Sequence, residues 1–171
     1  SYRTCGTVKN YNNDIGLPVT IGKVNPECQM LVLEMGMNHF GEMRLLTSIG
    51  RPDTVVITNI GSMHIENLGS REGILKAKLE ILEGLRPGGT CFFNGDEPLL
   101  WNLRESSREK TWYFGIENPG CDIRASEIQL MEGKSVFRVQ GMDQDFQVEL
   151  AVGGLHNVHN ALAAISVALY Y

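Results

Sequence analysis

The sequence lacks long apolar runs and clusters of basic residues. Its longest apolar stretches, such as residues 30–33 and 54–57, are far shorter than the roughly 18 residues that a membrane-spanning helix needs. No secretory signal is recognisable at the start. Fifteen Lys and Arg residues against 20 Asp and Glu residues give a net charge of -5, which disfavours a surface that follows nucleic-acid phosphates. We therefore expect no membrane span and no nucleic-acid partner.

Cysteine is scarce, and no Cys-x-x-Cys pair occurs. The four cysteines stand far apart, at Cys5, Cys28, Cys91 and Cys121. This spacing favours reduced thiols over a disulfide framework or a zinc site. We therefore expect a cytoplasmic protein.

The length and composition are those of one globular domain. The chain has 171 residues, of which 43% are hydrophobic and 20% are charged. A chain of this size buries roughly 70% of its unfolded surface, which is enough for a sizeable core, and two full domains are disfavoured. Because the first residue is Ser1 and not Met, we expect a piece excised from a longer protein.

The first two thirds of the chain alternate between strand and helix patterns. Strands are predicted at residues 30–33, 54–58, 90–93 and 111–114, and helices at 41–48, 71–85 and 98–107. This alternation is typical of an α/β fold with a mostly parallel sheet flanked by helices. The run at 30–33 is apolar throughout, which predicts a strand that is covered on both faces.

The pattern changes after residue 121. Apolar residues then recur at strand spacing between turns at 132–134 and 141–143, which predicts a small antiparallel β meander. The Ala-rich segment 156–171 has helical spacing and predicts a final helix.

Lys78 is out of place on the predicted helix 71–85. At 100° per residue it falls in the middle of an arc of apolar side chains, whereas Lys76, Glu80 and Glu83 share the opposite face. The apolar arc consists of Ile74, Leu75, Ile81, Leu82 and Leu85. One interpretation is that the Lys78 stem follows the edge of the core to reach water. The other is a partly desolvated amine that reacts with CO2, and the resulting carbamate could bind a divalent cation.

Two further candidates follow predicted strands. Glu34 ends the run at 30–33, and His64 follows the strand 54–58 after a short loop. A Glu at a strand end can simply cap a helix, and a loop His is usually solvated. Together with Lys78, however, they supply the ligands of a Mg²⁺ site around phosphates at the edge where parallel strands end.

Asparagine is concentrated at two places. Asn10, Asn12 and Asn13 lie in the segment 6–18, which forms either a turn-rich loop or a polar surface for a substrate with carbonyls and hydroxyls. Asn157 and Asn160 stand one turn apart at the start of the last helix. Helix capping explains one Asn there, but not two.

Five segments together resemble a known family. These are residues 10–18, 33–43, 58–64, 76–81 and 154–164. In this order they are similar to the central domain of the Mur ligases, and the resemblance runs from Gly6 to Ala168. The Asn-rich loop and the string 36–42 favour the members of the family that add D-alanyl-D-alanine to UDP-N-acetylmuramoyl-tripeptide.

The resemblance implies an ATP-dependent amide-bond ligase that works through an acyl phosphate, with Mg²⁺ holding the anions together. It implies that Glu34 binds Mg²⁺ near the γ-phosphate, and that His64 and carbamylated Lys78 bind a second Mg²⁺. It also implies that Asn157 and Asn160 contact the adenine nucleotide, and that Asn10, Asn13 and His39 face the UDP-sugar peptide.

The sequence also departs from the family. It has no Gly-x-x-Gly-Lys-Thr loop to hold ATP phosphates. We therefore expect residues 1–171 to be a central domain that is truncated at its N-terminus, without the family's N-terminal UDP-binding domain and C-terminal domain. Lys9 replaces the usual Gly, so the loop conformation there is expected to differ. We expect a monomeric fragment that is inactive alone. The alternatives are another Mur-type or folylpolyglutamate-synthase-like amino-acid ligase, and a non-catalytic nucleotide-binding scaffold.

Overall fold

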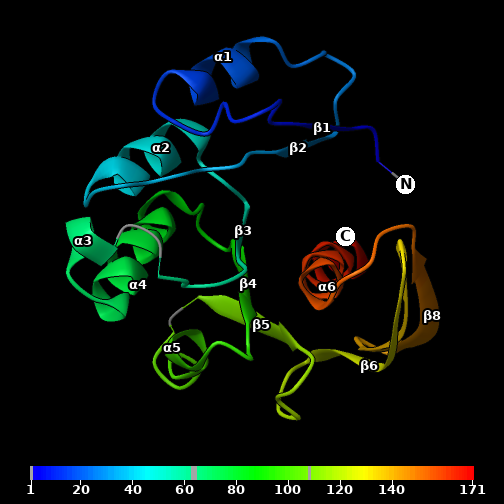
Figure 1. Ribbon diagram of the computed structural model, residues 1–171. Helices are drawn as coiled ribbons and strands as arrows, with labels where there is room; N and C mark the ends of the chain where they lie inside the picture. The colour runs from blue at the N-terminus through cyan, green and yellow to red at the C-terminus, as the bar shows by residue number, and fades with distance from the viewer. Residues whose placement is uncertain (1, 63–64, 108) are drawn as a thin grey trace. The chain divides into compact units, whose positions relative to one another are not determined.

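The computed structural model describes residues 2–62, 65–107 and 109–171 and divides the chain into two compact units. The first unit comprises Ser1–Asp53 and Gly61–Pro87, and the second comprises Thr54–Ile60 and Gly88–Tyr171. Figure 1 shows the elements of both units. The α/β class and the mostly parallel strand pairing are confirmed.

The first unit contains a two-stranded parallel sheet and most of the helices. Its elements are β1 (Thr4–Gly6), α1 (Gly16–Gly22), β2 (Met30–Val32), α2 (Glu42–Gly50), α3 (Ile65–Leu68), α4 (Arg71–Leu79) and the 3-10 helix η1 (Glu80–Gly84). Strand β2 is shorter than predicted, and its expected burial on both faces is wrong because Leu31 is 38% exposed and Val32 61% exposed. The reason is that β2 pairs with the short strand β1 and not with a wide sheet.

The predicted helix 71–85 changes type at Glu80. It begins with Ser70, whose hydroxyl accepts a hydrogen bond from the Gly73 amide, and continues as a 3-10 helix from Glu80. The hydroxyl of Thr47 on α2 donates to the Ile81 carbonyl at 2.7 Å. The carbonyl therefore finds its partner on α2, which favours the tighter winding of η1.

The second unit is built on one six-stranded sheet with the order β3-β4-β5-β6-β7-β8. Its strands are β3 (Thr54–Ile57), β4 (Thr90–Asn94), β5 (Lys110–Gly115), β6 (Ile123–Met131), β7 (Lys134–Gly141) and β8 (Gln144–Leu150). The first four strands are parallel, and β6, β7 and β8 form the predicted antiparallel meander. Helix α5 (Pro98–Trp101) is much shorter than the predicted helix 98–107, because successive turns replace the helix after Trp101.

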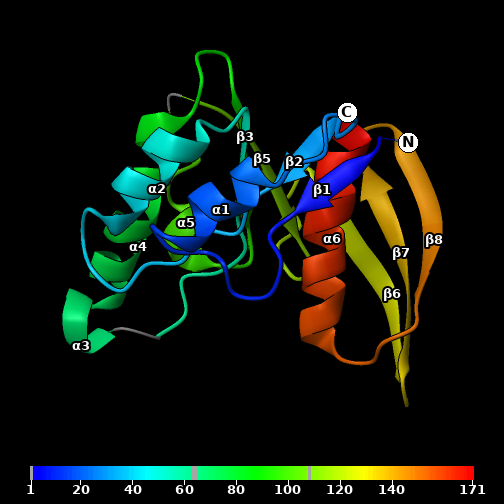
Figure 2. The same ribbon diagram turned by 90° about the horizontal axis from the view of Figure 1, so that it is seen from above.

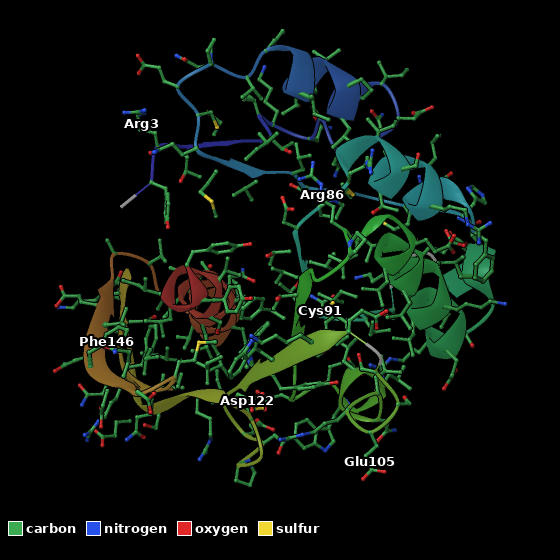
Figure 3. The ribbon with its side chains drawn as sticks, turned by 180° about the vertical axis from the view of Figure 1, so that it is seen from behind. Arg3, Arg86, Cys91, Glu105, Asp122 and Phe146 are labelled. Carbon is green, nitrogen blue, oxygen red and sulfur yellow. The ribbon has the colours of Figure 1, made fainter. Side chains whose placement is uncertain are left out.

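Helix α6 (Leu155–Tyr170) packs against the meander and the neighbouring parallel strands, as Figure 2 shows. Phe92, Phe114 and Phe137 from three strands meet Val158 and Leu162 of the helix in one buried cluster. All five side chains are at most 1% exposed. Cys91 lies among packed side chains of β4 (Figure 3). The final helix and its apolar face are thus confirmed.

Candidate functional site

Glu34 lies two residues beyond the end of β2 and is exposed. Its Oε1 atom accepts a hydrogen bond from Asn12 Nδ2 at 2.9 Å, and its backbone amide donates to Thr7 Oγ1 at 2.9 Å. The Asn12 carbonyl also accepts a bond from the Gly36 amide. A side chain at Gly36 would crowd the Asn12 amide, so glycine lets the two loops approach. The Glu34 carboxylate is therefore oriented by the Asn12 side chain and remains open to solvent.

Different asparagines of the Asn-rich loop hold the start of α1 and contact Glu34. Asn13 Oδ1 accepts a bond from the Gly16 amide at 2.7 Å, which satisfies a free donor at the start of α1. Asn10 is exposed and follows Lys9, whose φ of 55° is in the left-handed region that glycine favours. The backbone at Lys9 therefore adopts a glycine-like conformation although glycine is absent. The sequence placed Asn12 in this loop without predicting a partner for it, and the structure shows that it contacts Glu34.

His39 lies in the loop between β2 and α2. Its Nδ1 atom is 3.1 Å from Glu42 Oε1, and its side chain is 64% exposed. The Asn38 amide, which donates to Glu42 Oε2 at 2.7 Å, lowers the pKa of Glu42, and His39 adds to this effect. His39 is therefore open to a ligand and is held by a carboxylate that stays ionised at neutral pH.

Lys78 lies in the last turn of α4 and is half-buried. The buried stripe of this helix runs through Ile74, Ala77 and Glu80, not through Lys78 as the ideal helical wheel predicts. Glu80 was expected on the exposed face, but it is only 8% exposed. The expected exposure of Glu80 is therefore wrong, and partial burial of Lys78 agrees with both interpretations of its role.

In the second unit, the two predicted nucleotide contacts lie on the first turns of α6. Asn157 Nδ2 donates to the Gly153 carbonyl at 2.7 Å, and Asn160 is exposed. Between them, His159 Nδ1 is 3.9 Å from Asp96 Oδ2. The Asn157 side chain thus braces the entry to the helix, and Asn160 is open to solvent.

Asp96 is a structural centre that sequence reasoning missed. It follows β4, and its carboxylate accepts backbone N–H bonds from Ile116, Glu117 and Asn118 at 2.6, 3.0 and 2.8 Å. Nearby, Asn94 Nδ2 donates to the Thr58 carbonyl at 2.9 Å. These bonds tie together the carboxyl ends of β3, β4 and β5, where ligands bind in parallel sheets. The available signal was the polar sequence Asn-Gly-Asp, which begins at the last residue of a fully buried strand.

The predicted metal ligands are only partly described. Glu34 and Lys78 belong to the first unit, and His64 lies outside the described residues. Among the residues that are described, no three His, Cys, Asp or Glu side chains cluster to hold a metal. Mg²⁺ usually takes one or two carboxylates together with phosphates and water. Glu34 supplies one exposed carboxylate, which fits that donor set. A site that Glu34, His64 and Lys78 form together remains a prediction.

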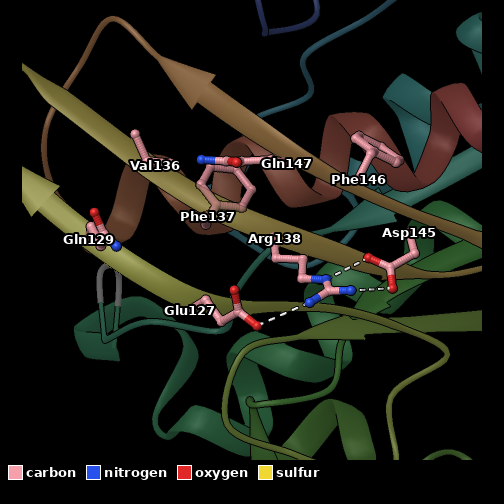
Figure 4. Close-up of a pocket in the computed structure, with 8 residues that line it drawn as sticks. All are labelled: Glu127, Gln129, Val136, Phe137, Arg138, Asp145, Phe146 and Gln147. Atoms are coloured by element: carbon pink, nitrogen blue, oxygen red, sulfur yellow. Dashed lines mark hydrogen bonds and ion pairs between the residues drawn. The ribbon is translucent and has the colours of Figure 1, made fainter.

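A hollow on the outer face of the meander contains none of the predicted site residues (Figure 4). At its centre, the Arg138 guanidinium binds Asp145 at 2.6 and 2.8 Å and Glu127 at 3.2 Å. Arg138 lowers the pKa of Asp145 by hydrogen bonding. One guanidinium thus faces two carboxylates, which leaves a net charge of -1 and no unpaired cation for an anionic ligand among the lining residues. In addition, no helix of the described chain is long and apolar enough to cross a membrane.

Comparison with known proteins identifies relatives over nearly the whole chain. The chain is 42% identical over 170 residues to a Bacillus subtilis protein named UDP-N-acetylmuramoyl-tripeptide–D-alanyl-D-alanine ligase, and the alignment covers 99% of this chain and 36% of that protein. The crystal structure of MurF from Acinetobacter baumannii matches with a TM-score of 0.90 and 33% identity, over 98% of this chain and 37% of that one.

A third relative is MurF ligase from Thermotoga maritima in complex with ADP. It matches with a TM-score of 0.84 and 29% identity, covering 98% of this chain and 39% of that one. The chain thus spans little more than a third of the length of these relatives. The sequence profile of the Mur ligase middle domain matches residues 1–168. The chain therefore belongs to the Mur ligase middle-domain family.

Proposed function

We propose that the chain is the middle domain of a cytoplasmic, monomeric, ATP-dependent ligase that joins D-alanyl-D-alanine to UDP-N-acetylmuramoyl-tripeptide in peptidoglycan synthesis. The observation that carries the proposal is the 42% identity across 99% of the chain to a ligase of that name. The ADP bound by the Thermotoga maritima relative supports ATP as the nucleotide. The folylpolyglutamate-synthase-like and scaffold alternatives have no comparable support.

In this proposal, ATP transfers its γ-phosphoryl group to the tripeptide carboxylate. The amine of D-alanyl-D-alanine then attacks the acyl phosphate, and phosphate leaves as the amide bond forms. The enzyme must bring two anions together before the first step, and Mg²⁺ supplies the charge neutralisation when it is bound. Glu34, held by Asn12, presents a carboxylate to the cation, and His64 and a Lys78 carbamate are the proposed ligands of the second cation.

The remaining predicted residues bind and orient the two substrates. Asn157 and Asn160 are proposed to contact the adenine nucleotide from the first turns of α6. Asn10, Asn13 and His39 are proposed to face the UDP-sugar peptide. For Asn13 this means that the side chain holds α1 in place beside the substrate, since its oxygen is already bonded to the Gly16 amide.

Substitution of Lys78 tests the proposal in the full-length protein that contains this chain. Phosphate release is measured with ATP, the UDP-linked tripeptide and D-alanyl-D-alanine. We expect Lys78→Ala to abolish ligation and to keep the fold, because Ala is a good helix former. Acetate should partly restore activity, because the missing group is an anionic oxygen ligand. Lys78→Arg should stay inactive, because a guanidinium cannot form the carbamate.

Lys76→Ala is the matched control, because Lys76 is an exposed cation two residues away with its ammonium 5.8 Å from the centre of the Phe40 ring. This variant should retain activity. A Lys78→Arg enzyme with substantial activity would mean that Lys78 acts as a plain cation. Absence of phosphate release from the wild-type enzyme with these substrates would refute the proposed function itself.

A further inference from the structure

Glu80 is a buried carboxylate that no predicted ligand site uses. It is 8% exposed, and both of its oxygens accept hydrogen bonds from the Gly41 amide, at 3.0 and 2.8 Å. The Arg44 amide is 3.4 Å from Oε2, and Arg44 Nη2 is 3.9 Å from Oε1. Gly41 is the N-cap of α2, where amides without helical partners favour an anion. Glu80 therefore closes the first turn of a helix that is distant in sequence.

The partners of Glu80 belong to the segment that carries other candidate residues. Gly41 lies two residues after His39 and seven residues after Glu34. Glu80 itself lies two residues after Lys78, at the point where α4 becomes η1. One buried carboxylate thus connects the Lys78 helix directly to the loop that follows Glu34.

The contact of Glu80 also sets the rotation of the Lys78 helix. Residues two apart on a helix project about 200° from one another, so fixing Glu80 against α2 directs Lys78 toward the other side. A second contact prevents sliding, because the Thr47 hydroxyl binds the Ile81 carbonyl and Gly84 packs directly on Thr47. Both the rotation and the axial position of the helix are therefore held from α2.

We propose that Glu80 is a positioning residue of the ligase reaction, which fixes Lys78 relative to the segment from Glu34 to Gly41. This inference rests on the proposed function. Glu80 does not touch substrate in this role; it acts through the backbone of Gly41 and the helix that carries Lys78. Loss of the contact should therefore slow turnover and leave nucleotide binding nearly unchanged.

The test compares Glu80→Gln with Glu83→Gln in the full-length enzyme. Glu83 is a matched control, because it is on the same 3-10 helix and binds the same Arg44, at 2.7 Å, but is exposed and caps no helix. For Glu80→Gln we expect kcat per folded enzyme to fall at least tenfold, the KM for ATP to change less than twofold, and amide hydrogen exchange at Gly41 to become at least tenfold faster. Glu83→Gln should change each quantity less than twofold.

A folded Glu80→Gln enzyme whose kcat stays within twofold of wild type would overturn the inference, because a merely structural role lowers stability and not the rate per folded molecule. If Glu80→Gln does not fold, Glu80→Asp takes its place, since it keeps the charge but is too short to reach the Gly41 amide. The same large fall in kcat with a nearly unchanged KM for ATP is then expected. An inactive wild-type enzyme would instead refute the proposed function, so the two failures are distinguishable.

Discussion

Asp96 provides the sharpest stability prediction, because three backbone amides depend on one carboxylate. Its side chain is 9% exposed, and the donors lie at 2.6–3.0 Å. Asp96→Asn keeps one acceptor oxygen and replaces the other with an NH2 group. That group then faces either the Ile116 amide or the amides of Glu117 and Asn118, which lose their acceptor. A hydrogen bond to a charged group contributes about 1.5–3 kcal/mol, and an unsatisfied buried donor costs about 1–3 kcal/mol. We therefore expect the variant to lose about 2–3 kcal/mol of unfolding free energy.

Urea unfolding followed by tryptophan fluorescence measures this loss. Both tryptophans, Trp101 and Trp112, lie in the second unit together with Asp96, so the signal reports on the relevant part of the chain. With a urea dependence of about 2 kcal/mol/M, the midpoint should fall by about 1–1.5 M. Glu149→Gln is the control in the same unit, because it breaks an exposed pair with Lys134 and should cost less than about 1 kcal/mol. A midpoint for Asp96→Asn within 0.2 M of wild type, roughly the effect of a neutral surface change, would refute the reasoning.

The two buried thiols, Lys9, Ser70 and nucleotide binding give further testable outcomes. Burial raises the pKa of the Cys91 and Cys121 thiols to about 12 from 9.0, so both should resist Ellman's reagent at pH 8 until the chain unfolds. Because the folded pKa lies above the unfolded one, their contribution to stability is present below about pH 9 and is lost as the pH rises toward 12, which urea unfolding at pH 8 and pH 10.5 should detect. Lys9→Gly should raise the thermal midpoint slightly, because it relieves a left-handed backbone at a cost in unfolded-chain entropy. Ser70→Ala should cost about 1 kcal/mol in urea unfolding, because the Gly73 amide loses its cap. Calorimetry of the 171-residue chain alone should show Mg·ATP binding weaker than micromolar, since the sequence has no Gly-Lys-Thr loop.

The elements that sequence periodicity predicted well are those stabilised by local patterns. The meander turns were visible as Glu-Gly and Met-Asp pairs, and Gly133, Met142 and Asp143 indeed have positive φ angles. Strand β1 was missed because three residues, Thr-Cys-Gly, give no periodic pattern, and its partner β2 was expected to be more buried than it is. In both cases the deciding factor is which strand lies alongside, and a local pattern does not contain that information.

The candidate site was predictable where residue type carries the chemistry, and not where burial changes it. Glu34 was identified as a strand-end carboxylate, and the structure places it exposed, two residues beyond the end of β2. Glu80 was assigned to solvent because a charged residue on an ideal helical wheel belongs on the polar face. The helix changes type at Glu80, and the free amides of α2 make burial of a carboxylate favourable. Neither fact can be read from the residues around Glu80.

Buried and exposed carboxylates have different tasks in this chain. Glu80 and Asp96 are at most 9% exposed, and each accepts bonds from backbone amides of a distant segment. Glu34 is exposed and bonded through one oxygen to a side-chain amide. An anion whose lone pairs are filled by fixed amides stabilises the backbone but has little capacity left for a cation. A cation such as Mg²⁺ therefore favours Glu34. The buried carboxylates instead fix the backbone, Glu80 at the start of α2 and Asp96 in the segment after β5.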